Sequence, residues 1–451
     1  MSLLRNSLQL IEGFRNLRRL RKNPLAFLDT LASEQGDWTP FRLGLVPFIL
    51  IKHPDFIKDV LVTHHQKFVK GLGLQRAKRL LGNGLLTSEG EFHKRERRLI
   101  QPLFHREAIL SYGEPMVVFA SRMCEGWKPG HQVDIAEEMR RLTLTIVAKA
   151  LFNADVERES ADIGDALNTA VQLFQLGMPV LLANLLYYLP LSASRRMRRA
   201  QARLDSVMYR IIREHRACAP SHRDVLSMLL QAQDFEVDGS FMTDEQIRDE
   251  ALTLFLAGHE TTAIALSWTW YLLSLNPDIE KKLHAEIDQV LGTRLPTVSD
   301  LPALSYTRMV LTESLRYYPP AWVISRMAVA DHRVDGHLIP PRTHMLISPY
   351  LMHRDARFFQ DPERFFPERW TSDAVAKQPA FTFLPFGAGP RNCIGEAFAW
   401  MEGILVLATI AQRWRLRLMS DHPIELEPRI TLRPKYGIRM VVEPLVPAGS
   451  C

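Results

Sequence analysis

The chain has 451 residues, of which 47% are hydrophobic and 24% charged, so it can bury a large core and has the composition of a globular protein. No repeat of fixed period and no Gly/Ser-rich linker divides it, which excludes solenoids and propellers and predicts one large domain. The net charge of +6 is concentrated in residues 1–22, where basic side chains outnumber acidic ones by five, so the remainder is nearly neutral and nucleic acid is not an expected partner.

Residues 1–24 form a basic segment ahead of the expected domain, which covers residues 25–451. In this segment Leu10, Ile11, Phe14 and Leu17 recur at helical spacing, between arginines. Such a helix can pack its apolar stripe on the body of the protein and leave its arginines in solvent, which is the commoner arrangement. A peripheral contact with a membrane surface is the first alternative. A cleaved organelle presequence is a lesser one, since the segment is rich in arginine and poor in acidic residues but not rich in serine.

The cysteines give the expected compartment. Cys124, Cys218, Cys393 and Cys451 are widely spaced and form no Cys-x-x-Cys pair, and the chain does not begin with a signal peptide. Free thiols of this kind are typical of a reducing compartment, so we expect a cytoplasmic protein.

Apolar periodicity predicts a mainly α-helical fold with a small β region. Strand-like runs are few and short, and they do not alternate with the helices, which disfavours doubly wound and barrel folds. The expected helices cover residues 135–153, 161–178, 193–218, 243–275, 277–291, 304–317 and 396–414, and the expected strands cover 41–45, 48–52, 327–329, 344–347 and 439–442.

The longest expected helix has clear ends. Thr243 and Gln246 form a capping-box pattern at its start, and Asn276 followed by Pro277 ends it. A helix of this length spans roughly 50 Å and must cross the whole domain. Its middle is apolar apart from residues 258–262. Burying polar groups at the centre of a helix costs folding free energy unless they form hydrogen bonds or serve a function.

The segment that points most directly to a chemical function is residues 386–395, Phe-Gly-Ala-Gly-Pro-Arg-Asn-Cys-Ile-Gly. It precedes the helix expected from Glu396. Its glycines let backbone N–H groups approach the sulfur of Cys393, and the start of the helix directs positive potential at it. Both effects favour a thiolate, which is the form of cysteine that binds a metal.

This segment resembles the haem-binding signature of the cytochromes P450, with Phe386, Gly389, Arg391, Cys393 and Gly395 on the matching positions. The resemblance implies haem b as cofactor and Cys393 as the axial ligand of its iron. It further implies that Arg391 contacts a haem propionate and that Phe386 packs on the sulfur side.

The centre of the long helix, Ala-Gly-His-Glu-Thr-Thr at 257–262, is similar to the oxygen-activation motif of the same family. Splitting dioxygen requires two protons beside the distal oxygen, so a hydroxyl and an acid are needed there. Thr261 is expected to hold the oxygen and a water, and Glu260 to relay protons. Ala257 and Gly258 would lie against the haem, with Gly258 permitting a close approach.

Further positions match the family in order along the chain. Glu313 and Arg316 lie on one helix face and, with Arg369, correspond to a buried charge network that braces the haem loop. His93, Arg97 and Arg326 correspond to propionate ligands, with His93 standing where the family usually has tryptophan.

The resemblance, from about residue 25 to 443, implies a P450 fold and a monooxygenase that uses O2. No flavin or ferredoxin sequence is appended, so a separate ferredoxin or flavodoxin system is the expected electron donor, and the match is to soluble, bacterial-type members, expected to be monomeric. The walls of the substrate pocket are apolar, which favours a terpene, steroid or fatty-chain substrate; they map to Leu254, Phe255, Ala321, Trp322, Val323 and Ile324.

Three other functions remain open from the sequence. A peroxygenase or lyase of the same fold would not need Glu260 and Thr261, and a haem protein without turnover would not need them either. A cysteine hydrolase would need a histidine base near Cys393, where the loop offers an arginine instead.

Overall fold

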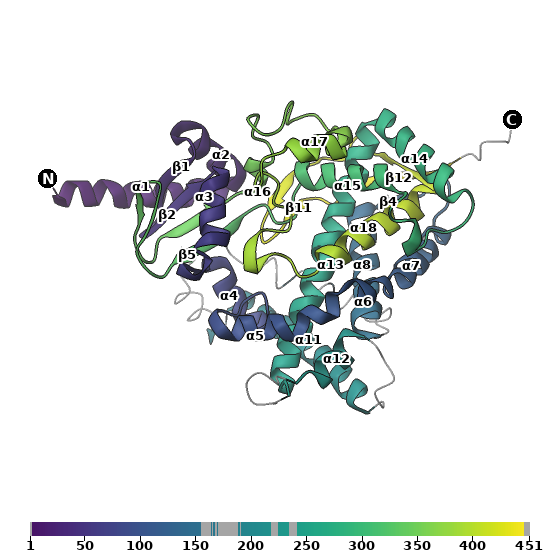
Figure 1. The fold of residues 1–451 in the computed structure, drawn as a ribbon, viewed down its shortest axis with the longest axis horizontal. Coiled ribbons are helices and arrows are strands. Elements are labelled where there is room, and N and C mark those ends of the chain that lie inside the picture. The colour runs from purple at the N-terminus through teal and green to yellow at the C-terminus, as the bar shows by residue number, and fades with distance from the viewer. Residues whose placement is uncertain are drawn as a thin grey trace.

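The computed structural model describes residues 2–154, 191–217, 224–233 and 241–445, with a few single positions between 164 and 189. The expected helix 161–178 therefore lies outside the described residues. Helices dominate one end of the molecule and a five-stranded sheet the other, with the two termini at opposite ends of the longest axis (Figure 1). The mainly α fold class with a small β region is confirmed.

Several helices before residue 126 were not predicted, whereas the helices predicted after it within the described residues form with small shifts at their ends, and together they make up the longer helices of the molecule. They are α1 (Ser2–Lys22), α2 (Pro24–Gln35), α4 (Leu72–Leu81), α5 (Gly90–Ile100), α7 (Gly113–Glu125), α8 (Ile135–Phe152), α11 (Ser192–Ala217), α13 (Asp244–Leu275), α14 (Pro277–Leu291), α15 (Ser305–Tyr317) and α18 (Glu396–Ala411). Shorter helical segments include α3 (Pro54–Lys58), the π-helix η1 (Asp59–Thr63), α6 (Arg106–Leu110), α12 (Val225–Gln231), α16 (Pro349–Met352), α17 (Ser372–Lys377) and the 3-10 turn η6 (Gly389–Arg391).

The larger sheet has the strand order β1-β2-β8-β5-β3, in which only β2 and β8 run parallel. Its strands are β1 (Trp38–Leu43), β2 (Val46–Ile51), β3 (Phe68–Lys70), β5 (Ile324–Ala328) and β8 (His344–Ile347). The smaller sheets contain β4 (Gln132–Asp134), β9 (Trp414–Leu418) and β12 (Arg439–Pro444), then β6 (His332–Val334) with β7 (His337–Ile339), and β10 (Leu426–Pro428) with β11 (Leu432–Pro434).

Several predicted boundaries are wrong: the strands predicted at 41–45 and 327–329 lie at Trp38–Leu43 and Ile324–Ala328, and the last helix differs most in consequence. The expected helix 396–414 ends at Ala411, and Trp414 already begins β9. Residues 414–418, Trp-Arg-Leu-Arg-Leu, alternate apolar and basic side chains, which is the period of a strand and not of a helix. This strand pairs with β12 at the helical end of the molecule.

Helix α13 is the axis of the helical body. Both hydrogen bonds of its predicted capping box form, with the Thr243 hydroxyl accepting from the N–H of Gln246 at 3.2 Å and Gln246 Oε1 accepting from the N–H of Thr243 at 2.8 Å. Most of its residues are buried, and they share one hydrophobic core with α7, α8, α15 and α18. The helix that carries the candidate oxygen motif is thus fixed by packing along most of its length.

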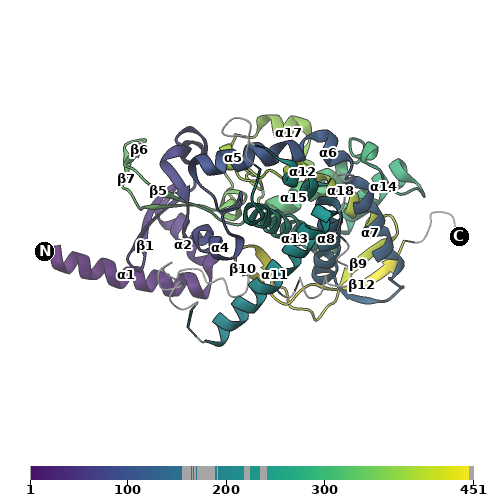
Figure 2. The same ribbon diagram turned by 90° about the horizontal axis from the view of Figure 1, so that it is seen from below.

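The N-terminal helix α1 lies along the edge of the sheet and projects beyond it (Figure 2). It meets the β1–β2 hairpin where the N–H of Gly44 donates to the carbonyl of Gly13 at 2.8 Å. Leu20 is buried on this side, whereas Ile11 is 67% and Phe14 55% exposed. Among the described residues, no helix is both long and apolar enough to span a bilayer.

Candidate active site

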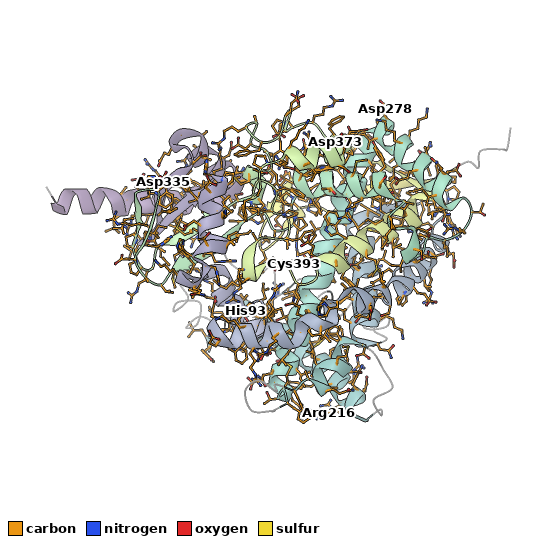
Figure 3. The ribbon with its side chains drawn as sticks, in the orientation of Figure 1. His93, Arg216, Asp278, Asp335, Asp373 and Cys393 are labelled. Carbon is orange, nitrogen blue, oxygen red and sulfur yellow. The ribbon has the colours of Figure 1, made fainter. Side chains whose placement is uncertain are left out.

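The loop before Cys393 is held by its backbone. The N–H of Cys393 donates to the carbonyl of Phe386 at 2.9 Å, and Gly387 and Gly389 adopt φ values of +75° and +71°. A Cβ on Gly389 would lie 2.1 Å from the carbonyl oxygen of Leu61 in η1, so only glycine fits there. The loop therefore lies directly against η1 and presents the cysteine at the start of α18, near the centre of the molecule (Figure 3).

The side chain of Cys393 is open to a cleft but lies deep within the protein, and its pKa is raised. Burial of the thiol within the protein is the largest cause, and it outweighs the lowering by the N–H of Gly395 and the charge of Arg97. The sequence predicted that the loop and helix start would favour a thiolate. The N–H of Gly395 acts in that direction, and a bound metal cation would add to it.

Helix α13 shows an open face at its middle. Ala257 is exposed, and Thr261, one turn later, is half-buried. The neighbouring residues Phe255, His259 and Glu260 are buried. The Thr261 hydroxyl donates to the carbonyl of Ala257 at 2.8 Å. A helix buried along most of its length but open at this turn fits a planar ligand lying against it.

Gly258 serves a different purpose from the one expected. A Cβ at this position would lie 3.1 Å from Cγ2 of Val147, so the glycine faces α8. The reason given from the sequence, a close approach to the haem, is corrected: the missing side chain lets α8 and α13 pack closely. Its backbone carbonyl accepts from the Thr262 hydroxyl at 3.3 Å.

Glu260 is buried and already has partners. Its Oε1 accepts from the Arg433 guanidinium at 2.6 Å and from the Thr431 hydroxyl at 3.1 Å, both next to or within β11. Its Oε2 lies 3.9 Å from Nε2 of His259. The acid expected to relay protons is thus held by an arginine that no motif had singled out.

Basic side chains from four segments converge beside the loop. Three of them are Arg391, His93 on α5 and Arg326 on β5, all predicted, and the fourth is Lys70 on β3. Burial first, and then the neighbouring guanidinium groups, lower the pKa of Lys70 well below its usual range and that of His93 to about 3. Burial, followed by the charge of Arg391, lowers the pKa of Arg326 to about 10.

Glu89 is the carboxylate that offsets this cluster. It forms an ion pair with Arg391, and its Oε1 accepts from the backbone N–H of Lys70 at 2.5 Å. Among the residues that the structure describes, no carboxylate lies within ion-pair distance of Lys70 or Arg326. Buried cations in excess of buried anions fit a ligand that brings two carboxylates, as the propionates of haem do.

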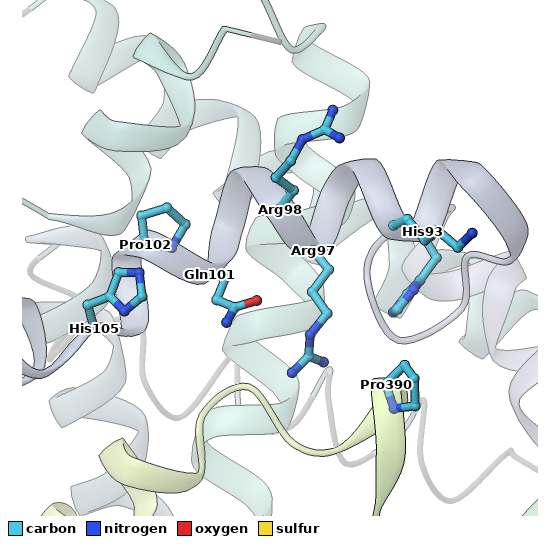
Figure 4. Close-up of a pocket in the computed structure, with 8 residues that line it drawn as sticks. His93, Arg97, Arg98, Gln101, Pro102, His105 and Pro390 are labelled. Carbon is cyan, nitrogen blue, oxygen red and sulfur yellow. The ribbon is translucent and has the colours of Figure 1, made fainter. Parts of the chain in front are cut away.

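Arg97 links α5 to the loop. Its guanidinium donates to the backbone carbonyl and to Oδ1 of Asn392 at 2.9 and 2.8 Å. In Figure 4, Arg97 and His93 extend from α5 toward the loop segment at Pro390. They belong to a pocket of about 360 Å³ whose lining also includes Lys94, Arg98, Gln101, Pro102 and His105.

A second cleft, of about 820 Å³, lies on the same side of the loop and reaches Cys393. Arg97, Arg308, Asn392 and Trp400 contribute to its walls. Arg308 lies over the ring of Trp400 at 5.0 Å, so basic and aromatic groups alternate along this opening.

The predicted network around Glu313 is complete. Its two oxygens accept from Arg316 at 2.8 and 2.9 Å, from Arg369 at 2.9 Å and from Trp370 Nε1 at 2.8 Å. Arg316 also donates to the carbonyl of His353, whose Nε2 accepts from the N–H of Leu384 at 2.9 Å. A chain of hydrogen bonds thus runs from α15 to the residues just before the cysteine loop.

The candidate pocket residues divide into two groups. Ile324 lies near the loop, 3.9 Å from the Cβ position of Gly387, and Ala321 and Val323 are half-buried. Leu254 is buried. Phe255 packs on Phe152, and Trp322 lies in the core below the sheet with Nε1 donating to the carbonyl of Arg429 at 2.9 Å.

The structure gives Phe255 and Trp322 packing partners inside the protein, so their place in a substrate pocket stays a prediction. Sequence reasoning missed Lys70, Glu89, Asn392 and Arg433. Lys70, Glu89 and Arg433 belong to no short motif, and Asn392 lies in the cysteine segment at a position that the signature does not specify. Each acquires a role through contacts with residues distant in the sequence.

Comparison with known proteins identifies the family to which this chain belongs. The family model described as Cytochrome P450 matches residues 8–441. The chain belongs to the cytochrome P450 family. Among its relatives, cyclooctatin synthase from Streptomyces melanosporofaciens is 40% identical over 94% of this chain and 92% of its own, and pentalenene oxygenase from Streptomyces avermitilis is 34% identical over 92% and 94%.

Solved P450 structures have the same fold. The retinoic acid-bound cyanobacterial CYP120A1 superposes with a TM-score of 0.84 at 27% identity, covering 94% of this chain and 95% of that one. This P450 is therefore an oxidoreductase of the monooxygenase class that binds haem and acts on a hydrophobic substrate with O2 and a redox partner. The fold, the family and the enzyme class predicted from the sequence are confirmed.

Proposed function

We propose that this P450 inserts one oxygen atom of O2 into a neutral terpene-type substrate, with haem b bound through Cys393 and electrons from a separate ferredoxin or flavodoxin system. The observation that carries the proposal is the position of the exposed Cys393 side chain beside a surplus of buried cations. When bound, the haem iron supplies the binding and activation of dioxygen.

The cation cluster would hold the cofactor by its carboxylates. Arg97, Arg326 and Arg391 are the proposed propionate ligands, with His93 as a neutral hydrogen-bond donor because its pKa is lowered to about 3. Lys70 joins them, since it is buried in the same cluster. Each propionate would relieve the repulsion that the cations exert on one another.

On the opposite side, Thr261 and Glu260 would manage protons. The Thr261 hydroxyl donates its proton to the carbonyl of Ala257, so its oxygen would accept a hydrogen bond from water beside the cofactor. Glu260 is held by Arg433 and Thr431 through Oε1. Proton relay would then use Oε2, or would require the ion pair with Arg433 to open.

The relatives' names support a terpene-type substrate. They include a cyclooctat-9-en-7-ol 5-monooxygenase, 39% identical over 88% of this chain, and the pentalenene oxygenase named above. The pocket residues singled out from the sequence carry no charge, which suits a molecule without ionised groups.

The electron donor is proposed to be a separate acidic protein. Lys94, Arg98 and Arg308 surround the two openings beside the cysteine loop, where an acidic partner would find opposite charge close to Cys393. We further propose a cytoplasmic monomer, divided into residues 1–24 and a domain of 25–451. The exposed Ile11 and Phe14 among arginines leave room for a peripheral membrane contact of α1.

The test is the absorption spectrum of the reduced protein with carbon monoxide, recorded for the wild type and for Cys393→Ala. A red-shifted Soret band that the variant loses is expected, because the band reports a thiolate ligand. Cys124→Ala is the matched control, since this thiol is buried in the core and its pKa is raised to about 12. A red-shifted band that persists in Cys393→Ala would contradict the proposal.

A further inference from the structure

A cluster of metal-binding side chains lies at the β-rich end, apart from Cys393. Asp59, His64 and His332 each offer one ligand atom, and these atoms lie within 4.8 Å of one another. His64 Nδ1 is 2.7 Å from Asp59 Oδ2, and His332 Nε2 is 2.6 Å from Asp59 Oδ1. We propose that these three residues form a binding site for a zinc-class transition-metal ion.

The local fold explains how Asp59 and His64 come together. In an α-helix, residues five apart point about 140° away from each other around the axis. Residues 59–63 instead form the π-helix η1, closed by the N–H of His64 donating to the carbonyl of Asp59 at 2.8 Å. The wider turn brings both side chains to one side, and π-helical turns of this kind are rare and concentrate at functional sites.

His332 comes from a distant part of the chain. It is the first residue of β6, in the small hairpin with β7 that Figure 2 shows at the outer edge of the molecule. Its ring is 4% exposed, lies 4.6 Å from that of His64 and meets Phe68 edge-on at 5.6 Å. One ligand is thus buried and fixed, whereas the His64 side chain is 41% exposed and leaves an open path for an ion.

The donor set selects the ion. Two imidazoles and one carboxylate suit zinc and its neighbours, whereas calcium and magnesium prefer all-oxygen sites. In a tetrahedral zinc site the ligand atoms stand roughly 3.3–3.6 Å apart, since each is about 2.0–2.2 Å from the metal. Each histidine contact to Asp59 would have to lengthen by less than about 1 Å. The ligand atoms farthest apart, which lie within 4.8 Å of one another, would have to approach to that spacing, and water would complete the coordination.

Lys67 disfavours binding of the ion at His332. Its Nζ lies 3.3 Å from Nδ1 of His332. An ammonium group only donates, so this contact makes Nδ1 the acceptor and puts the ring proton on Nε2. A metal at Nε2 requires the other tautomer, in which the proton sits on Nδ1 and Lys67 turns away. Lys67 is only half-buried and can do so, at a cost in affinity.

The site adjoins the cysteine loop through η1. Leu61, two residues after Asp59, is the residue whose carbonyl fills the space beside Gly389. A metal held by Asp59 and His64 would therefore stiffen the turn on which this loop rests.

The experiment is zinc binding to the haem-loaded protein without an affinity tag, measured by equilibrium dialysis with elemental analysis and by calorimetry. One zinc per chain is expected, with a dissociation constant in the micromolar range or tighter. Asp59→Asn and His332→Gln should each weaken binding at least about tenfold. Lys67→Gln should strengthen it, because the competing ammonium is gone.

His65→Gln is the matched control. His65 follows His64 directly, but its Nδ1 is bonded to the carbonyl of Val62 at 2.8 Å, so its loss should leave zinc binding unchanged. If His332→Gln does not fold, His64→Gln tests the same site at its more exposed ligand. Absence of stoichiometric zinc in the wild type, or equal losses in His65→Gln and His64→Gln, would overturn the proposal.

Discussion

The molecule contains two buried groups of charged side chains that differ in balance. Around Glu313, every donor of the network meets an acceptor, and both Glu313 and Arg316 are fully buried. Around Arg391, the cations Lys70 and Arg326 lie in the interior with Glu89 as the one carboxylate that acts on them. The first group is complete without a ligand, and the second is not.

This difference separates a structural network from a binding site. Buried charges are stable only when they are paired, so a complete network resists change and an incomplete one creates affinity for an opposite charge. Residue types alone do not distinguish the arginines of the two groups; only the resemblance to the family assigned them different roles. The difference depends on which carboxylates the fold brings near each arginine.

The largest expected effect comes from breaking the complete network. Glu313→Gln leaves the guanidiniums of Arg316 and Arg369 buried without a counter-charge, which should cost about 3–5 kcal/mol of unfolding free energy. Urea denaturation followed by circular dichroism measures this loss. Glu363→Gln is the control, because Glu363 is 68% exposed in its pair with Arg354 and should contribute less than about 1 kcal/mol. Equal losses in the two variants would contradict the distinction.

A third buried charge sharpens the comparison. Glu402 on α18 is fully buried, and its burial raises the pKa to about 8 from an ordinary 4.5, with the Thr262 hydroxyl opposing the shift. Between these two pH values the unfolded chain is ionised while the folded protein keeps the proton, so the stability of the wild type should fall as pH rises. Glu402→Gln should remove this fall and be more stable by about 1–3 kcal/mol at pH 7.

Urea midpoints at several pH values between 4.5 and 8 test this prediction. Glu443→Gln, a carboxylate 49% exposed, should follow the wild-type curve. Parallel curves for the wild type and Glu402→Gln would show that Glu402 is ionised in the folded protein.

The smallest expected effect on the fold comes from the incomplete group. Arg326→Met removes a cation that has no carboxylate partner among the described residues, so the haem-free protein should be at least as stable as before. Haem should transfer to excess apomyoglobin about tenfold faster, which corresponds to about 1.4 kcal/mol. Arg439→Met, on an exposed position of β12, should change neither quantity. A less stable haem-free protein together with an unchanged rate of haem transfer would assign Arg326 to structure only.

Local patterns were enough for the elements that depend on neighbours in sequence. The caps and length of α13 follow from Thr243, Gln246 and Pro277, and the turns of the cysteine loop follow from its glycines. The pair of Glu313 and Arg316 is close because three residues separate them on one helix. The strand 414–418 was missed although its alternation was present, because the preceding apolar helix was extended through it.

The sequence by itself determined the family, the cysteine that we propose as the haem ligand and the order of the motifs, since these reside in short segments whose residue types are dictated by backbone geometry and ligand chemistry. Only the tertiary structure decided which charges are paired. It placed Arg433 on Glu260, Lys70 beside Arg326, and His332 on Asp59, contacts that join residues far apart in the chain. Electrostatic energy depends on distance and burial in space, and neither quantity can be read from spacing along the chain.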